Sequence, residues 1–281
     1  MYEVIDISTW SQDLSIQASG TREKYWVQAT KERKDKLLFK IPKVRGEIWA
    51  EKVAAEIGKS IDLNMMNVSF ATHNEREGVL LENFSPNGIE MYDGGEILST
   101  VVEQFNPKEL DDYSIENITK ALDHFDLIDQ FISVCVFDSL IANQDRHCEN
   151  WAIMLVKGNY EFSPIYDNGS SLGFNESEEV LREYLRDEVR FKAFTNRAKT
   201  LIEVNGNRKP KVKQLMDYLS VHFAKTVNRE IDRTQSLDYN KLNTILDKVP
   251  DHLMSDIQRD WVVKLIAYRV DWLTYWRKEL V

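Results

Sequence analysis

The most informative stretch of this sequence is residues 143–169, which read NQDRHCENWAIMLVKGNYEFSPIYDNG. It opens with the polar stretch NQDRHCEN, which a packed core would not contain. Two β-prone runs follow, 151–156 and 160–165, and the Lys-Gly-Asn between them indicates a tight turn. A hairpin of this kind folds back on itself, so it is expected to return Asp167 to a position beside Asn150.

Three side chains in this stretch carry the oxygen atoms that phosphoryl transfer requires, namely Asp145, Asn150 and Asp167. Such a reaction needs a carboxylate that orients the attacking hydroxyl and oxygen ligands for Mg²⁺. An aspartate five residues before an asparagine, followed by a hairpin that returns a second aspartate before a glycine, is typical of protein-kinase-like enzymes. Each residue alone is more often a turn former, so the inference rests on their order and spacing.

The sequence on either side of this stretch favours helices. Residues 124–142 are apolar almost throughout, which predicts a helix buried on most sides and forming the spine of a second lobe. From Asp251 to the end, aromatic and aliphatic side chains recur every three or four residues, which predicts a further helix. The plain interpretation of those aromatic side chains is core packing.

The N-terminal part predicts a small mixed lobe. Residues 25–29 and 36–41 read as an antiparallel hairpin, and residues 46–58 as an amphipathic helix that ends at glycine. Residues 68–72 and 78–82 read as two more strands. The chain then loosens through a stretch rich in glycine, which we take as the lobe boundary.

The expected architecture is therefore an α+β, two-lobed, protein-kinase-like fold. Its domains are a mixed α/β lobe over residues 1–84 and a mainly helical lobe over residues 85–281. With 43% hydrophobic and 29% charged residues among 281, the composition is that of an ordinary globular protein.

Net charge, cysteine content and the N-terminal sequence bear on which partners and which cellular compartment are expected. The net charge of −10 would repel phosphate backbones, so direct nucleic-acid binding is not expected. Two cysteines are too few for a disulfide framework, which favours the cytoplasm. Neither a secretory signal nor a long apolar segment is visible, so we expect no membrane association.

The segments NQDRHCEN and SPIYDNG resemble the catalytic loop and the metal-binding aspartate of the HipA-like serine/threonine kinases. The resemblance covers roughly residues 18–174. It implies an ATP-dependent protein kinase with ATP and Mg²⁺ as cofactors and a protein as substrate. It makes Asp145 the catalytic base, and Asn150 and Asp167 the metal ligands.

The same resemblance implies an ATP site in the first lobe. Lys40 would grip phosphates, with either Glu47 or Glu51 holding it, and we favour Glu51. The remaining candidate nucleotide-binding residues belong to a phosphate loop (Gly20, Thr21, Lys24), a hinge that would hold adenine (Glu82, Asn83, Phe84) and the catalytic loop (His147). His147 could instead pack within its loop and orient its neighbours.

Several alternatives stay open. The chain resembles a compact, kinase-core form without the extra N-terminal subdomain of full-length HipA toxins, which leaves an antitoxin-like partner open. The D-R-H-x-x-N pattern also occurs in phosphoinositide kinases, so a lipid or small-molecule kinase is the second enzymatic hypothesis. A nucleotide-binding pseudokinase is the third. The basic run 208–213 could contact an acidic substrate or be a solvated loop.

Overall fold

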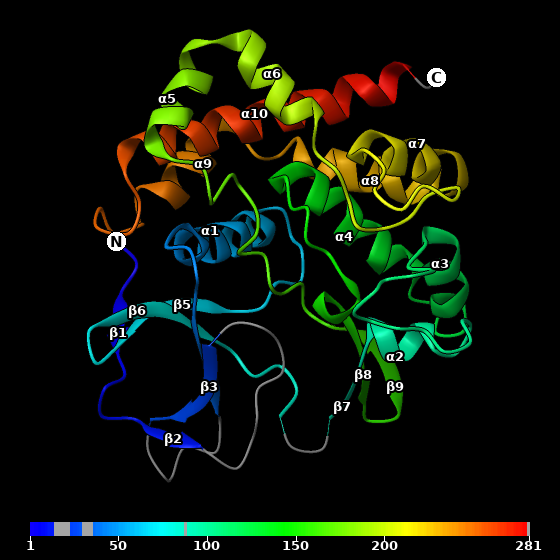
Figure 1. Ribbon diagram of the computed structural model, residues 1–281, viewed down its shortest axis with the longest axis horizontal. Coiled ribbons are helices and arrows are strands. Elements are labelled where there is room, and N and C mark those ends of the chain that lie inside the picture. Colours follow the sequence, from blue (N-terminus) through cyan, green and yellow to red (C-terminus); the bar gives the residue numbers. More distant parts are fainter. Residues whose placement is uncertain (14–22, 30–35, 87–88, 280–281) are drawn as a thin grey trace.

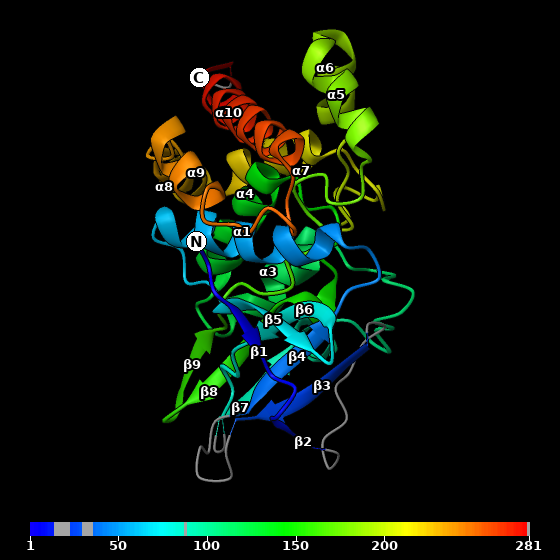
Figure 2. The same cartoon turned by 90° about the vertical axis from the view of Figure 1, so that its left-hand side faces the viewer.

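The computed structural model describes residues 1–13, 23–29, 36–86 and 89–279. A sheet-based lobe lies at one end of the molecule and most of the helices lie at the other, with α1 (Gly46–Ser60) between them (Figures 1 and 2). This two-lobed arrangement of a mixed α/β lobe and a helical lobe is the expected fold class. Both views place α1 directly against the six-stranded sheet, so the helix links the sheet to the helical lobe.

The first lobe is built on a sheet with the strand order β1-β5-β6-β4-β3-β2. In chain order the strands are β1 (Val4–Asp6), β2 (Ser11–Asp13), β3 (Glu23–Gln28), β4 (Leu37–Ile41), β5 (Val68–His73) and β6 (Arg76–Leu81). β1 runs parallel to β5, and the other neighbours are antiparallel. Both predicted hairpins are present, but β1 and β2 were not foreseen, because strands of three residues carry no alternating pattern.

α1 is longer than its sequence suggested. The prediction ended this helix at Gly58, yet the helix continues to Ser60. Gly58 serves packing instead: a Cβ atom there would lie 2.4 Å from the Sδ atom of Met65, so any larger residue would force the Met65 side chain to move. Gly58 therefore lies within α1, where it contacts Met65, and the predicted end of this helix was wrong by about half a turn.

The second lobe contains a small sheet and the remaining helices. The sheet has the order β7-β8-β9, formed by β7 (Glu90–Asp93), β8 (Ala152–Val156) and β9 (Asn159–Phe162). The helices are α2 (Gly94–Leu98), α3 (Ile115–Asp123), α4 (Ile128–Ile141), the 3₁₀ turn η1 (Cys148–Asn150), α5 (Glu178–Arg186), α6 (Glu188–Asn196), α7 (Val212–His222), α8 (Ala224–Thr234), α9 (Tyr239–Leu246) and α10 (Asp256–Glu279). The lobe boundary at residue 84 stays a prediction.

Three predicted element ends were displaced by three residues or more. The helix predicted over 124–142 starts only at Ile128, because Asp126 adopts a left-handed conformation with φ of 57° that interrupts the chain after α3. The strand predicted over 160–165 ends at Phe162. The last helix begins at Asp256 rather than Asp251, after a turn in which Pro250 accepts a hydrogen bond from the Leu253 amide.

The apolar core is continuous between the two lobes. It runs from Trp49 and Val53 of α1 through Phe137 of α4 to Trp261 of α10, all of them buried. Trp261 and Trp276 of α10 thus pack in the core and Tyr268 and Trp272 pack against it, as their spacing predicted, whereas Tyr275 is 64% exposed. In the described part of the chain, no helix has the length and apolar character needed to span a membrane.

Candidate active site

The loop that carries Asp145 follows directly from the end of α4. Ala142 takes a left-handed conformation (φ 54°) and turns the chain out of the helix. The amide of Asp145 then donates to Asn143 Oδ1 at 3.0 Å, and Asn150 Nδ2 donates to the Asp145 carbonyl at 2.9 Å. The backbone of Asp145 is therefore held from both sides while its side chain is exposed. A carboxylate in this position is fixed and accessible.

Asp167 lies on the loop that follows β9. It has a φ of 54°, which is unusual for a residue other than glycine and is maintained only when the surroundings hold it. Here the carboxylate of Glu51 on α1 accepts hydrogen bonds from the amides of Asn168 (2.7 Å) and Gly169 (3.1 Å). The helix of the first lobe thus fixes the loop of the second.

Arg146 joins the two loops. It is 2% exposed, and each of its five N–H groups donates to an acceptor. The acceptors are both carboxylate oxygens of Asp138 (2.8 and 2.9 Å), the carbonyls of Asn150 and Tyr166 (2.7 Å each) and the side-chain oxygen of Asn168 (2.8 Å). We call Arg146 and these four acceptor residues, Asp138, Asn150, Tyr166 and Asn168, the arginine network. Because it bonds to the residues just before and after Asp167 and to Asn150 itself, it brings the two loops together.

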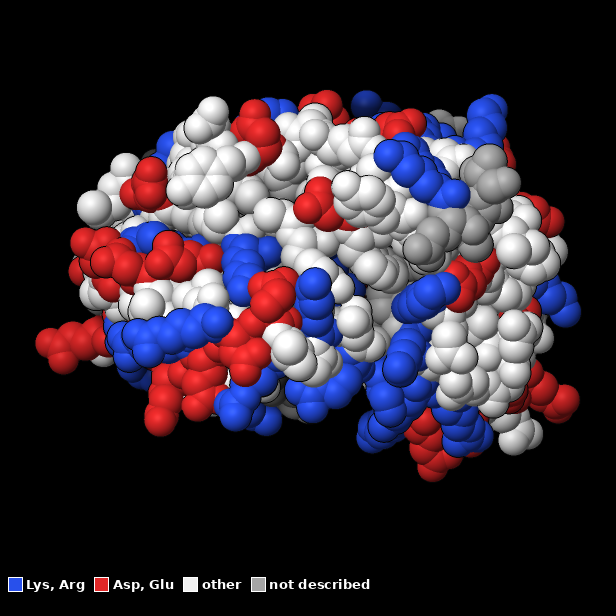
Figure 3. All heavy atoms as spheres, turned by 90° about the horizontal axis from the view of Figure 1, so that it is seen from above, with Lys and Arg blue, Asp and Glu red and all other residues white. Residues whose placement is uncertain are grey.

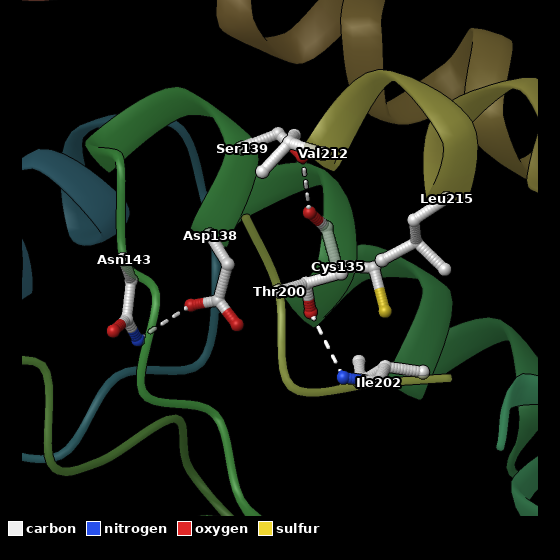
Figure 4. A pocket seen from close by; sticks show the side chains of 8 residues that line it. All are labelled: Cys135, Asp138, Ser139, Asn143, Thr200, Ile202, Val212 and Leu215. Atoms are coloured by element: carbon white, nitrogen blue, oxygen red, sulfur yellow. Dashed lines mark hydrogen bonds between the residues drawn. The ribbon is translucent and has the colours of Figure 1, made fainter. Parts of the chain in front are cut away.

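Sequence reasoning missed both charged members of the arginine network. A signal was present, because Asp138 is the only charged residue between Phe131 and Ala142 in an otherwise apolar helix. A buried carboxylate needs a partner, and the adjacent loop offers Arg146. Figure 4 shows Asp138 and Asn143 reaching toward each other across the turn that ends α4, where Asn143 Nδ2 donates to Asp138 Oδ1 at 3.0 Å.

A second charged group, which we call the lysine cluster, lies between the lobes and consists of Lys40, Glu51 and Asp167. Lys40 Nζ lies 3.2 Å from Glu51 Oε2 and 2.5 Å from Asp167 Oδ1. The structure thus pairs Lys40 with Glu51, the partner that the sequence favoured over Glu47. Lys24 on β3 is directly opposite Lys40 in the sheet, so both lysines lie on the same face.

The lysine cluster shifts the acidity of its members. Burial alone would raise the pKa of Asp167, but the charge and hydrogen bond of Lys40, with help from Lys24 and Arg146, lower that pKa to about 2. Burial would likewise lower the pKa of Lys40, yet Glu51 and Asp167 raise it above its usual value. The Asp167 side chain is still 39% exposed, so a ligand can reach its charged oxygens.

Asn150 and Asp167 fit the requirements of a divalent cation such as Mg²⁺. Asp167 offers an ionised carboxylate, and within the described residues the Oδ1 atom of Asn150 accepts no hydrogen bond while its Nδ2 is occupied by Asp145. No cluster of three His, Cys, Asp or Glu side chains occurs in the described ranges. The arrangement would therefore hold an ion jointly with oxygen atoms of a ligand, as phosphate-bound Mg²⁺ is usually held.

The predicted hinge residues and His147 form no hydrogen bond or ion pair with Lys40 or Asp167 in the described part of the chain. Glu82 donates its amide to the Asn67 carbonyl (3.1 Å), Asn83 Oδ1 caps the Ser85 amide (3.1 Å), and the ring of Phe84 lies 5.2 Å from that of Tyr166. His147 Nδ1 accepts a hydrogen bond from the Glu149 amide at 3.3 Å, so it contacts its own loop. Gly20 and Thr21 lie outside the described residues.

One further hydroxyl contacts the site. Ser170 Oγ donates to Asp145 Oδ2 at 3.3 Å. The neighbouring Ser171 is buried and bonds back to the carbonyl of Asn168 instead. Of the two serines after the D-N-G motif, Ser170 is therefore the one that touches the candidate base.

Comparisons with known proteins agree with this geometry. The family model described as the HipA-like C-terminal domain matches residues 16–254. The serine/threonine-protein kinase CtkA of Helicobacter pylori is 24% identical over 232 residues, which cover 79% of this chain and 69% of that protein.

Solved structures give the same fold. The crystal structure of the Helicobacter pylori proinflammatory kinase CtkA superposes with a TM-score of 0.81 at 21% identity, covering 99% of both chains. A chain of the HipA, HipB and operator DNA complex of the Shewanella oneidensis toxin–antitoxin system superposes with a TM-score of 0.60 at 11% identity, covering 94% of this chain and 67% of that one.

Proposed function

This chain belongs to the HipA-like C-terminal domain family, and from that premise we propose that it is an ATP-dependent serine/threonine protein kinase. The observation that carries the proposal is the convergence of Asp145, Asn150 and Asp167, together with the buried ion pair of Lys40 and Glu51. The name of the relative CtkA, a serine/threonine-protein kinase, supports the same activity.

In this proposal each residue has one role. Asp145 accepts the proton of a serine or threonine hydroxyl as that oxygen forms a bond to the γ-phosphorus of ATP and the bond from this phosphorus to the β-phosphate oxygen breaks, releasing ADP. Lys40 binds phosphate oxygens, and Glu51 keeps its ammonium group in place. Asn150 and Asp167 would hold Mg²⁺, which neutralises negative charge on the phosphates when bound.

The hinge prediction fits this role. In the described residues neither the Glu82 carbonyl nor the Phe84 amide makes a hydrogen bond, and adenine presents one donor and one acceptor along its edge. We therefore propose that these two backbone groups bind adenine. Phe84, packed on Tyr166, would form one wall of the site.

The experiment that tests the activity compares wild type with two variants, using labelled ATP, Mg²⁺ and a generic protein substrate. We expect Asp145→Ala to lower kcat roughly 10³-fold and to leave the dissociation constant for Mg-ATP nearly unchanged, because the base acts on the transition state. Asp167→Ala should instead weaken Mg-ATP binding, measured by calorimetry.

Asp123→Ala is the matched control, because it removes an exposed carboxylate at the end of α3. Equal phosphate incorporation by wild type and Asp145→Ala would refute the proposal. Binding of Mg-ATP without transfer to any substrate would show a pseudokinase instead.

A further inference from the structure

The basic run at residues 208–213 has a place in the fold that its sequence did not reveal. The chain between α6 and α7 doubles back so that Lys199 and Lys211 form an antiparallel bridge. The amide of Lys199 donates to Gln144 Oε1 at 3.1 Å, and Gln144 directly precedes Asp145. The basic segment therefore lies beside the candidate catalytic base.

Buried and exposed side chains alternate along the two bridged segments, and the buried ones hold the segments against the protein. Ala198 (7%), Thr200 (8%) and Val212 (5%) are buried, whereas Lys199 and Lys211 between them are exposed. Figure 4 shows the buried residues Thr200, Ile202, Val212 and Leu215 next to Cys135 and Ser139 of α4. Because neighbouring side chains of an extended chain point in opposite directions, packing on α4 forces both lysines outward.

The charges of this segment divide into paired and unpaired groups. Arg208 pairs with Asp111 at 2.7 Å, and Lys213 pairs with Asp217 at 2.9 Å. Throughout the described part of the chain, no acidic side chain pairs with Lys199, Lys209 or Lys211, which we call the basic patch. Viewed from above, Lys and Arg side chains gather at the lower right of the molecule, on the side of α7 (Figure 3).

Retaining this patch carries an energetic disadvantage for the free protein. Like charges directly opposite each other on paired strands repel, and Lys199 and Lys211 occupy such positions. The chain as a whole carries an excess of ten acidic charges, so carboxylates to neutralise them are plentiful elsewhere. An arrangement that leaves these lysines unpaired beside the site is explained if a ligand supplies the negative charge.

We propose that the basic patch binds acidic residues next to the phosphorylated serine or threonine of the protein substrate. This proposal rests on the proposed kinase function and specifies the class of substrate, namely protein segments with acidic residues beside the phosphorylated hydroxyl. A substrate hydroxyl must reach Asp145, so the residues flanking it pass over the neighbouring loop at about 3.3 Å per residue. Three lysines on a protein of net charge −10 are too few for strong binding to a phosphate backbone, which needs many such contacts.

The first test measures binding, so it does not depend on catalysis. Fluorescently labelled peptides that carry one serine flanked by Glu, by Gln or by Lys are titrated with the full chain, and anisotropy is recorded at low and at high salt. We expect the Glu peptide to bind most tightly and to weaken with salt. The variant Lys199→Ala/Lys211→Ala should bind it about tenfold more weakly.

The matched control is Arg208→Ala/Lys213→Ala, which removes the same charge from the same segment but from residues already paired within the protein. We expect it to bind the Glu peptide as wild type does. Equal binding of the three peptides, or equal losses in the two double variants, overturns the proposal. Tighter binding of a short single-stranded oligonucleotide or of anionic vesicles through the same two lysines also overturns it.

The second test uses the transfer reaction. Lys199→Glu/Lys211→Glu should reverse the order of kcat/KM for the Glu and Lys peptides, and a merely structural role would not produce a reversal. Phosphate transfer with no preference among peptides overturns substrate recognition while the kinase function stands. If no peptide is phosphorylated, the proposed function fails, and the anisotropy experiment still decides whether the basic patch binds acidic peptides.

Discussion

The arginine network and the lysine cluster lie side by side but are built differently. Arg146 is buried, and all five of its N–H groups already have partners within the protein. Lys40 is also buried, but its partner Asp167 is open to solvent, and both carry charges that ATP and Mg²⁺ would engage. The Arg146 guanidinium has no donor left for a ligand, whereas Lys40 and Asp167 would exchange their mutual contact for ligand atoms.

The difference shows that Arg146 holds the two loops of the site in place, whereas Lys40 and Asp167 are available to bind ligands. We propose that Lys40 binds phosphate and that Asp167 binds a metal ion. Bound nucleotide would therefore replace the direct contact between Lys40 and Asp167 in the lysine cluster. In the arginine network no such exchange is available, because breaking any of its hydrogen bonds would leave a buried polar group without a partner. Substitutions of the two buried charged members, Asp138 and Arg146, should therefore alter stability most, and those in the lysine cluster should alter ligand binding and rate.

The largest effect on stability is expected from Arg146→Ala. It leaves the carboxylate of Asp138 buried without its cation, so the free energy of unfolding should fall by about 3–5 kcal/mol. Urea unfolding followed by tryptophan fluorescence measures this change. The double variant Asp138→Leu/Arg146→Met removes both buried charges and should recover part of the stability, because the carbonyls of Asn150 and Tyr166 still lose their donor.

Arg182→Ala provides the comparison, because it breaks an exposed ion pair with Glu178 on α5. Its effect should stay below about 1 kcal/mol. If Arg146→Ala costs no more than Arg182→Ala, the arginine network does not act as the scaffold of the site.

A smaller effect is expected at Asp167, and it depends on pH. The pKa of this carboxyl lies at about 2 in the folded protein, below its ordinary 3.8. Its contribution to stability is therefore complete above about pH 5 and is lost as the pH falls toward 2. Because the side chain is 39% exposed, we expect Asp167→Asn to cost only about 1 kcal/mol at pH 7.

Unfolding curves of wild type and Asp167→Asn, recorded between pH 7 and pH 2, measure this contribution. The two free energies should converge as the pH falls, because the wild-type carboxyl then becomes neutral like the amide. A difference that stays constant down to pH 2 would show that the charge of Asp167 does not stabilise the unliganded site.

The smallest effect concerns Ser170, which contacts the base from the edge of the site. Loss of one long hydrogen bond in Ser170→Ala should lower kcat about threefold and leave KM for ATP unchanged, because only the orientation of Asp145 is affected. Ser170→Thr retains the hydroxyl and should restore the rate. Ser220→Ala on α7, whose hydroxyl bonds within its own helix, serves as the control. A change in KM for ATP without a change in kcat would contradict this role.

Much of the fold followed from local patterns. Short β-prone runs located the strands of both hairpins of the first lobe, an almost uninterrupted apolar stretch located α4, and apolar residues on one helix face located α1 and α10. Element ends were less predictable, as at Gly58, where a loop packs on the helix, and at Asp126, where one left-handed residue separates two helices. In each case the deviation arises from interactions that a short window of sequence does not contain.

The sequence by itself determined the chemical groups of the candidate site: the order of Lys40, Asp145, Asn150 and Asp167 and the spacing that favours phosphoryl transfer. Only the tertiary structure decided that Glu51 holds Lys40 and the loop after Asp167, that Arg146 ties the loops together, and that Lys199 and Lys211 lie beside the base. Residue type and spacing act along the chain, whereas the hydrogen bond between Lys40 and Asp167 joins residues 127 positions apart. Which distant residues meet is set by how the lobes pack.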